Sequence, residues 1–398
     1  MPAARSRFAV IFFTVVVDLI GFGIIIPILP YYAKRLGAGG LGLGALLAVF
    51  SGMQFVATSF LGRTSDRVGR RPILLATMLV NALGYLLFAA AHSYAVLFVA
   101  RVVSGFAGGN ISAAQAYIAD ITSPAERSRG MGIIGAAFGL GFIIGPALGG
   151  LSAHYLGPAA PGLVAAGLSL ANFGSAYLVL PESLKSEHRT ARQLWDFSHI
   201  GDAMRNPRLA PLMLAWLVAP FAFSGYTVAL PFWANLTFGW QEHQLGWLFT
   251  VIGATAAVVQ GYAFGKLARR FGDRALLIAG GFGMALGIGV IPALHSSAAL
   301  YAWTAALAFS NSIFGPAATG LVSVFAGPAE QGTVLGAAQA LGALGRLLGP
   351  LALGRVYDAS HAAAFLVAGA VMALAGLVCF RVPKSEQDRV VREQALSG

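Results

Sequence analysis

The sequence predicts an all-α integral membrane protein, with twelve transmembrane helices arranged as two six-helix pseudo-repeats. Apolar residues make up 57% of the 398 residues and charged residues only 10%, whereas soluble domains carry roughly 25% charged residues. Mean hydropathy is +0.75. The apolar residues form continuous runs and do not alternate with polar ones, which favours membrane helices over barrel strands. Motifs of the first half also recur in the second half, which indicates an internal duplication.

Twelve apolar runs are each near or above the roughly 20 residues that a helix needs to cross a bilayer. They cover residues 8–30, 41–61, 72–91, 94–119, 131–153, 159–180, 210–236, 244–264, 275–294, 297–324, 332–354 and 362–381. The start of the first run resembles a signal peptide. Asp18 interrupts that run and no small-residue cleavage site follows it, so we count it as the first span.

The longest polar stretch lies between the sixth and seventh runs and divides the spans into two groups of six. We therefore predict a six-helix bundle at residues 1–182, a cytoplasmic linker at 183–208 and a second bundle at 209–398. Within the linker, the residues around 194–200 are typical of a short amphipathic helix.

Basic residues indicate the orientation of the spans. With both termini in the cytoplasm, 21 of the 26 lysines and arginines fall on inner segments, and outer segments hold only Lys34, Arg35 and Arg355. The positive-inside rule then predicts a multi-pass protein of the cell (inner) membrane with both ends cytoplasmic. The same rule explains the net charge of +11, so we expect no nucleic-acid partner.

The reactive side chains argue against an enzyme. All seven histidines lie in loops or at span ends, and no paired acids or nucleophile with a base occur within the spans. Nothing resembles a metal site or a phosphate-binding loop. The single cysteine, Cys379, excludes an intrachain disulfide. We therefore expect no catalytic residues, no cofactor and no bound metal.

A charged hinge at residues 62–72 joins the second and third spans. Five charges stand there between two apolar runs. Gly62 and Gly69 allow positive φ and close backbone approach. Asp66 precedes Arg70 by four residues, a spacing at which opposite charges pair on one helical turn.

A second copy of the hinge follows at residues 265–274. It keeps both glycines at an offset of 203 residues, but Arg269 replaces the acid. Three further motifs repeat at offsets of 203 or 204 residues: His92-Ser93 at His295-Ser296, Pro124-Ala125-Glu126 at Pro328-Ala329-Glu330, and Gly145-Pro146 at Gly349-Pro350. One inserted residue accounts for the slip between the two offsets.

Two parallel six-helix repeats of this kind resemble the major facilitator superfamily. The hinge is similar to that superfamily's signature between spans two and three, at Gly62, Asp66, Arg67, Gly69, Arg70 and Arg71. The resemblance implies a substrate site between the halves near the bilayer midplane.

It also implies a latch in which the acid, Asp66, caps the start of span eleven, near Gly332, in the outward-open state. A carboxylate at a helix N-terminus contributes about 0.3–1 kcal/mol. We expect Asp120, at the cytoplasmic end of span four, to pair with Arg70. Alternatively, these charges only orient the helices.

Span five holds six glycines within sixteen residues. Such residues let a neighbouring helix approach closely, and a proline frees a carbonyl and bends the helix. The arrangement resembles the antiporter signature of proton-driven drug exporters, which in that superfamily separates export from import. Packing alone would explain a few of the glycines. The signature residues are Gly135, Gly139, Gly141, Gly145, Pro146 and Gly149.

Charged residues inside spans are functional candidates, because a charge at the bilayer centre costs about 2.5–3.5 kcal/mol or more. Three qualify here: Asp18, Arg101 and Arg346. Asp18 is the only acid deep in a span. The stretch from Arg101 to Gly108 resembles the superfamily's span-four signature linked to proton transfer. We predict that Asp18 carries the coupling proton with Arg101 as its nearest partner. A static buried ion pair or a substrate anchor is the alternative.

Polar and aromatic residues within the spans are candidates for lining a substrate cavity. Uncharged polar side chains also bond neighbouring helices, at about 0.6 kcal/mol each, and aromatics near helix ends also form interfacial belts. The candidates are Gln54, Asn110, Gln115, Phe221, Tyr226, Trp233, Gln260, Asn311, Gln339 and Arg346.

Within the superfamily, the sequence is most similar to the tetracycline/proton antiporters. The likeness is carried by Leu47-Ala48 through Met53-Gln54, by Ser65-Asp66-Arg67 through Pro72 and by Phe238-Gly239-Trp240. Three residues depart from that group. Its acid in span three is Gly84 here, its histidine in span eight is an alanine around Ala256, and its acid in span nine falls near Gly283.

The resemblance implies a monomeric, proton-coupled exporter of amphipathic small molecules or drugs that works by alternating access among the membrane lipids. It needs no cofactor beyond the proton gradient. The three departures argue against tetracycline itself, and Arg346 indicates an anionic or neutral amphipathic substrate. An uncoupled facilitator or a lipid flippase for an anionic amphipathic substrate is the alternative.

Overall fold

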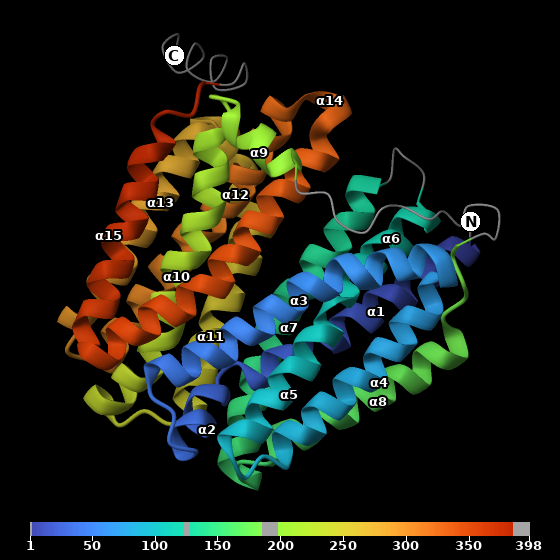
Figure 1. Cartoon of the computed structure of the whole chain (residues 1–398), viewed down its shortest axis with the longest axis horizontal. Helices are drawn as coiled ribbons and strands as arrows, with labels where there is room; N and C mark the ends of the chain where they lie inside the picture. The colour runs from blue at the N-terminus through green and yellow to red at the C-terminus, as the bar shows by residue number, and fades with distance from the viewer. Residues whose placement is uncertain (1, 123–126, 185–197, 385–398) are drawn as a thin grey trace. The chain divides into compact units, whose positions relative to one another are not determined.

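The computed structural model describes residues 2–122, 127–184 and 198–384, and every regular element among them is helical (Figure 1). The first half contains α1 (Pro2–Ile25), α2 (Leu29–Arg35), α3 (Gly40–Val68), α4 (Arg70–Ala89), α5 (Tyr94–Ala107), η1 (Gly108–Asn110), α6 (Ile111–Ile121), α7 (Arg127–Leu156) and α8 (Ala160–Val179). The second half contains α9 (Ser198–Arg205), α10 (Ala210–Phe238), α11 (Glu242–Val258), η3 (Val259–Ala263), α12 (Phe264–Phe271), α13 (Asp273–Gly289), η4 (Ile291–Ala293), α14 (Ser297–Ala359) and α15 (His361–Cys379).

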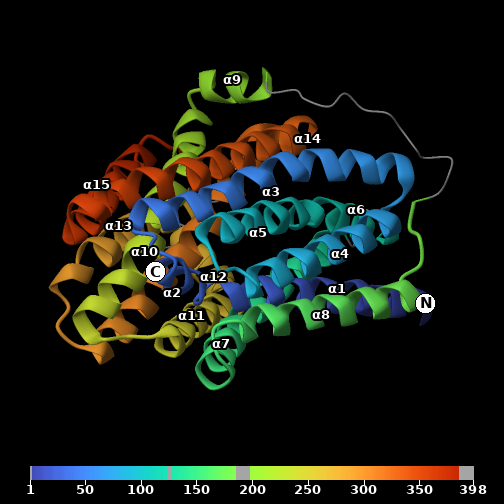
Figure 2. The ribbon, with the colours of Figure 1, turned by 60° about the horizontal axis from the view of Figure 1, so that its bottom comes forward.

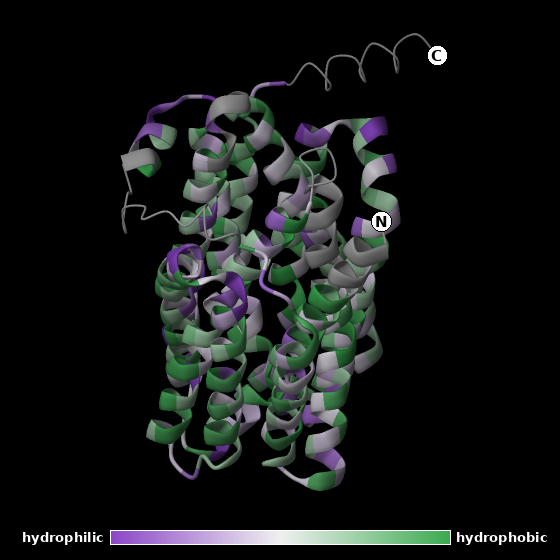
Figure 3. Ribbon diagram, turned by 90° about the vertical axis from the view of Figure 1, so that its right-hand side faces the viewer, coloured by the Kyte–Doolittle hydropathy of each residue, from purple (hydrophilic) through white to green (hydrophobic). Residues whose placement is uncertain are grey.

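Eleven helical stretches of the described residues are long and apolar enough to cross a membrane, and Figure 3 shows long hydrophobic runs along the helices. The predicted ninth span corresponds to α13, which is shorter at 17 residues and is followed by the 3-10 turn η4. The tenth and eleventh spans, Ser297–Ala326 and Thr333–Ala359, both belong to α14. A straight helix of 63 residues would measure about 95 Å, and Figure 1 shows α14 doubling back. The predicted all-helical membrane architecture is confirmed.

Contacts divide the chain into two compact units whose borders differ from the sequence halves. The first unit comprises Met1–Ala38, Val49–Trp195 and Trp240–Thr250, and the second comprises Gly39–Ala48, Asp196–Gly239 and Val251–Gly398. The start of α3 therefore belongs to the second unit and the start of α11 to the first. Of the predicted linker, residues 185–197 lie outside the described residues, including the first part of the expected amphipathic helix. The described part of that expected helix, residues 198–200, lies in α9.

The first unit is built around α1, which runs beside α8 (Figure 2) and packs along α7. Its core joins Ile11 and Val15 of α1 to Met78 of α4 and Tyr117 of α6. The Tyr117 hydroxyl donates a hydrogen bond to the Pro181 carbonyl at 3.0 Å, which satisfies its only polar group. The unit therefore buries large apolar side chains around the helix that carries Asp18.

The second unit is organised around α10, which packs on α14 and α15. Tyr226 is fully buried there, with its hydroxyl 3.4 Å from the Thr304 hydroxyl. Trp233 is 8% exposed and packs edge-on against the rings of Phe238 and Phe365. Neighbouring helices cover both side chains, and the expectation that Tyr226 and Trp233 line a substrate cavity stays a prediction.

The internal duplication extends to local structure. The Ser93 hydroxyl caps α5 by accepting the N–H of Val96 at 3.4 Å. The Ser296 hydroxyl, 203 residues later, caps α14 by accepting the N–H of Ala299 at 3.1 Å. Both serines have extended backbones, as N-cap residues require. The same helix start is therefore built twice from the same residue type.

Candidate functional site

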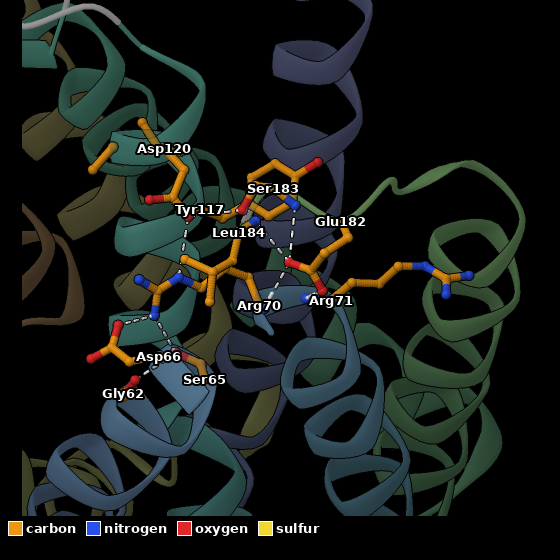
Figure 4. Close-up of polar contacts among 12 residues, drawn as sticks. Gly62, Ser65, Asp66, Arg70, Arg71, Tyr117, Asp120, Glu182, Ser183 and Leu184 are labelled. Carbon is orange, nitrogen blue, oxygen red and sulfur yellow. Dashed lines mark hydrogen bonds and ion pairs between the residues drawn. The ribbon is translucent and has the colours of Figure 1, made fainter. Parts of the chain in front are cut away.

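The charged hinge turns the chain sharply between α3 and α4 (Figure 4). Gly69 separates the two helices with φ 120° and ψ 156°, a conformation open essentially to glycine alone. The first backbone N–H groups of α4 have no partners within the helix. The Glu182 carboxylate is the partner of two of these groups, because it accepts the N–H of Arg70 at 2.9 Å and of Arg71 at 3.2 Å. Sequence reasoning missed Glu182, although it directly follows the sixth span.

Arg70 is the centre of the hinge cluster. Its side chain is 8% exposed, and its Nη1 lies 2.5 Å from Asp66 Oδ1. Its Nε donates to Asp120 Oδ2 at 3.2 Å, and Nη1 also donates to the Ser65 hydroxyl at 2.7 Å. The predicted pairs of Arg70 with Asp66 and Asp120 are both present. Arg67 is exposed beside them, and the capping of span eleven by Asp66 stays a prediction.

Gly62 brings α3 close to α6. A Cβ atom at Gly62 would lie 3.2 Å from the Ser112 hydroxyl oxygen. That hydroxyl donates to the Thr58 carbonyl of α3 at 3.0 Å. A larger residue at Gly62 would have to displace this bond between the helices.

Asp18 is held by two asparagines. Its Oδ2 accepts from Asn110 Nδ2 at 2.8 Å, and its Oδ1 accepts from Asn172 Nδ2 at 3.4 Å. Asn172 also donates to the Thr14 carbonyl at 2.9 Å, which ties α8 to α1. The sequence alone did not single out Asn172. The residue that singles it out, Asp18, is 154 positions away in the sequence.

Arg101 forms no ion pair with Asp18, so the structure does not show the static buried pair that was the alternative, and the role of Arg101 in proton coupling stays a prediction. Among the described residues Asp18 takes part in no ion pair. The Arg101 guanidinium is 4% exposed and lies over the ring of Phe50, 4.2 Å from its centroid. Its Nε is buried without a hydrogen-bond partner. An aromatic face therefore takes the place of the expected carboxylate.

The glycines of α7 bring its backbone against α1. A Cβ atom at Gly141 would lie 2.6 Å from Leu19 Cβ, and one at Gly145 would lie 2.7 Å from Gly23 Cα. Gly149 meets the Ile24 carbonyl in the same way. These three positions recur every four residues on one face. Gly139 is half-buried on the same helix, and Gly135 lies in its first turns, where burial is outside the described residues.

The second unit repeats part of this glycine face. Gly345 and Gly349, each 204 residues after a glycine of α7, pack against the backbone of α10 at Leu217 and Phe221. Helix packing therefore accounts for the shared glycines. Gly149 makes the same kind of contact with α1, but the second unit has Leu353 at the corresponding position.

The remaining cavity candidates divide by exposure. Gln54 is half-buried and donates to the Gly108 carbonyl at 3.1 Å, a bond between helices. Phe221 is half-buried against α14. Four uncharged candidates are exposed within spans: Gln115, Gln260, Asn311 and Gln339. Gln260 lies in η3, a π-helical turn. Such turns interrupt α-helices frequently at functional sites.

Arg346 is an exposed cation within the eleventh span, inside Thr333–Ala359 of α14. Its Nη1 lies 3.5 Å from the point where a Cβ atom of Gly342 would stand, one turn earlier, and that point is 3.2 Å from Trp216 Cε3. The guanidinium therefore lies back along α14, on the side where this helix meets Trp216 of α10. A charge at membrane depth needs water, a counter-charge or a ligand.

Comparison with known proteins gives a consistent result along the chain. The family model described as Major Facilitator Superfamily matches residues 11–241 and 212–396. The class C tetracycline resistance protein of Escherichia coli is 31% identical, over 94% of this chain and 96% of its own length. Multidrug resistance protein 2 of Bacillus subtilis (strain 168) is 29% identical, over 92% of this chain and 93% of its own. The crystal structure of the human organic anion transporter MFSD10 (TETRAN) superposes with a TM-score of 0.71 at 27% identity, covering 95% of this chain and 100% of that one.

Proposed function

Because the chain belongs to the Major Facilitator Superfamily, we propose that this transporter exports amphipathic small molecules in exchange for protons, with organic anions as the preferred class. The two bacterial relatives named above carry names of drug-resistance proteins, and the human relative is named an organic anion transporter. We further propose that it works as a monomer in the cell (inner) membrane with both termini cytoplasmic, so that the hinge cluster faces the cytoplasm.

The observation that carries the proton-coupled part is the setting of Asp18. Its two carboxylate oxygens accept from the amides of Asn110 and Asn172, and no described cation forms an ion pair with it. A fixed cation would hold the carboxylate in its ionised form. Neutral amides offer both a donor and an acceptor, so they can bond either form of the carboxyl group. A proton carrier needs this tolerance.

The substrate class follows from the charges of the spans. Arg346 offers an exposed cation, whereas two positions that carry acids in the tetracycline group are closed by packing here. A Cβ atom at Gly84 would lie 3.1 Å from the Ser104 backbone nitrogen, and one at Gly283 would lie 2.9 Å from Ser310 Cβ. Neither position has room for a carboxylate side chain. The spans therefore favour an anion over a cation.

Proteoliposomes with an imposed pH gradient test this function. We expect the purified protein to concentrate a carboxylate-bearing amphipathic dye only while the gradient lasts, with a matching proton flux reported by a trapped pH indicator. Arg346→Gln should reduce movement of that dye about tenfold, or 1.4 kcal/mol, and leave a quaternary-ammonium dye unchanged. Arg355→Gln, on the same helix, serves as the matched control. Movement without a proton flux would contradict proton coupling, and equal losses for both dyes would contradict the choice of anions.

A further inference from the structure

Two helix contacts occupy corresponding places in the repeats, at the ends of α3 and α11 that lie farthest from their hinges. In the second unit, α3 begins against the end of α14. A Cβ atom at Gly40 would lie 2.6 Å from the Gly354 carbonyl oxygen. The Asp358 carboxylate accepts the backbone N–H groups of Gly40 at 2.6 Å and Leu41 at 2.8 Å. A carboxylate thus caps this helix start.

In the first unit, α11 begins against the end of α7 in the same manner. A Cβ atom at Gly246 would lie 2.7 Å from the Pro146 carbonyl oxygen, and one at Gly150 would lie 3.0 Å from His243 Cα. The glycine contact is therefore repeated, but the carboxylate is not. His154 stands 204 residues before Asp358. Its ring faces that of His243, with centroids 4.6 Å apart and planes 48° apart.

The Glu242 carboxylate acts on His243 but is shared with a cation. Glu242, next to His243, is bonded to Arg35 at 2.5 Å, so its charge is already compensated. Tyr155 packs edge-on against the His154 ring at 4.8 Å. His243 Nδ1 is buried without a hydrogen-bond partner, whereas His154 is exposed. Neither histidine forms an ion pair with an acid among the described residues.

We propose that His154 and His243 form a proton-binding site, separate from Asp18, whose double occupancy loosens the contact between α7 and α11. Two neutral imidazoles, or one neutral and one protonated ring, pack at this distance without charge repulsion. A second proton places two cations 4.6 Å apart, and the repulsion acts directly on the glycine contact. Histidine is the side chain that gains its charge over the pH range that a proton-exchanging transporter meets. The proposal rests on the proposed function only in that proton exchange would expose the two histidines to low pH.

A cysteine at the seam between the helices measures the contact. The Thr250 hydroxyl donates to the Ile143 carbonyl of α7 at 3.2 Å, so Thr250→Cys in a Cys379→Ala background reports on access to this seam. Its maleimide labelling rate is normalised to a cysteine at the exposed Gln241. Lowering the pH from about 7.5 to about 5.5, across the histidine range, should raise the normalised rate about tenfold.

Substitutions of the pair decide the origin of that response. Because the repulsion needs two cations, His154→Gln or His243→Gln alone should abolish the response as fully as the double substitution does. His154→Asp installs the residue that the second repeat carries. It should reverse the response, because acid then creates an attraction to His243. His92→Gln, a matched exposed histidine elsewhere in the chain, should leave it unchanged.

Two results would overturn the proposal. One is a labelling rate that does not change with pH in the unsubstituted pair. The other is a response that survives in His154→Gln, which would assign it to the neighbouring Glu242–Arg35 pair. The measurement uses neither substrate nor gradient, so its outcome is independent of the proposed transport activity.

Discussion

The two hinges share a backbone but differ in their charges. Gly69 and Gly272 both adopt positive φ, 120° and 80°, with ψ of 156° and 155°. The arginine two residues after each of these glycines also has the same role in both units. Arg71 donates to the Tyr177 carbonyl at 2.6 Å, and Arg274 donates to the Phe380 carbonyl at 2.7 Å.

What differs is the residue between the glycine and that arginine. The first hinge has Arg70, bonded to Asp66 and Asp120. The second has Asp273 in its place and Arg269 where the first has Asp66. The shared parts turn the chain and satisfy the ends of the last helix of each half. The first hinge thus sets one cation between two acids, whereas the second carries the opposite signs at the two corresponding positions, and we take the first as the candidate for a conformational role.

Breaking the charge cluster should have the largest effect on stability. Arg70→Gln leaves Asp66 and Asp120 without their partly buried cation, which we expect to cost about 3 kcal/mol of unfolding free energy. Asp273→Asn, at the corresponding position, gives the value for the second hinge in the same assay. Unfolding of both variants in mixed micelles measures the difference. Equal losses would remove the distinction between the hinges.

The shared glycines should matter equally in both hinges. Alanine at either position would adopt a backbone conformation that costs about 1–3 kcal/mol. We therefore expect Gly69→Ala and Gly272→Ala to lower the free energy of unfolding by similar amounts, near 2 kcal/mol. If only Gly69→Ala is destabilised, the second hinge can relax and the two turns are not equivalent.

The capping arginines should contribute a smaller and again equal amount. Each bonds a carbonyl at the end of the last helix of its half, α8 or α15. Such charged hydrogen bonds at a helix C-terminus are worth about 1 kcal/mol. Arg71→Ala and Arg274→Ala should each lose about that amount in the same unfolding assay. A large excess for Arg71 would place it within the charge cluster.

Asp66 should affect stability least and transport most among the hinge acids. It is 34% exposed and pairs with Arg70 one turn away, so Asp66→Asn should cost only about 0.5 kcal/mol. If Asp66 is the latch, the transport rate falls severalfold and labelling of cavity cysteines from the cytoplasmic side rises. Arg269→Gln, at the corresponding position of the second hinge, is the matched control. Unchanged labelling in Asp66→Asn would contradict the latch.

The sequence predicted the features that follow from composition and local spacing. The hydrophobic runs predicted the membrane helices, and the spacing between Asp66 and Arg70 predicted their ion pair. Both features depend on residues that are near one another in the chain. Asn172 escaped notice, since only the packing of α8 on α1 brings it to Asp18. For the same reason, the sequence could not show that Arg101 forms no ion pair with Asp18. The depth of a residue in a span does not show which ring its side chain meets, and Arg101 meets that of Phe50.

The sequence also could not predict which aromatic side chains are buried or which histidines meet. Tyr226 and Trp233 read as pocket residues or belt residues from composition, but helix packing in the second unit encloses both. His154 and His243 read as loop histidines, because 89 residues separate them. The 204-residue offset between His154 and Asp358 was available in the sequence. What the sequence does not show is the contact of each residue: Asp358 caps α3, whereas His154 packs on His243.

Replacing Asp18 by asparagine tests the central claim of proton coupling most directly. Asparagine keeps the size of the side chain and resembles the permanently protonated form. In proteoliposomes, we expect Asp18→Asn to keep gradient-independent exchange of labelled for unlabelled substrate and to lose uphill export driven by a pH gradient. The retained exchange shows that the protein is folded and binds substrate. A variant that still concentrates substrate against its gradient would contradict the assignment of Asp18 as the proton carrier.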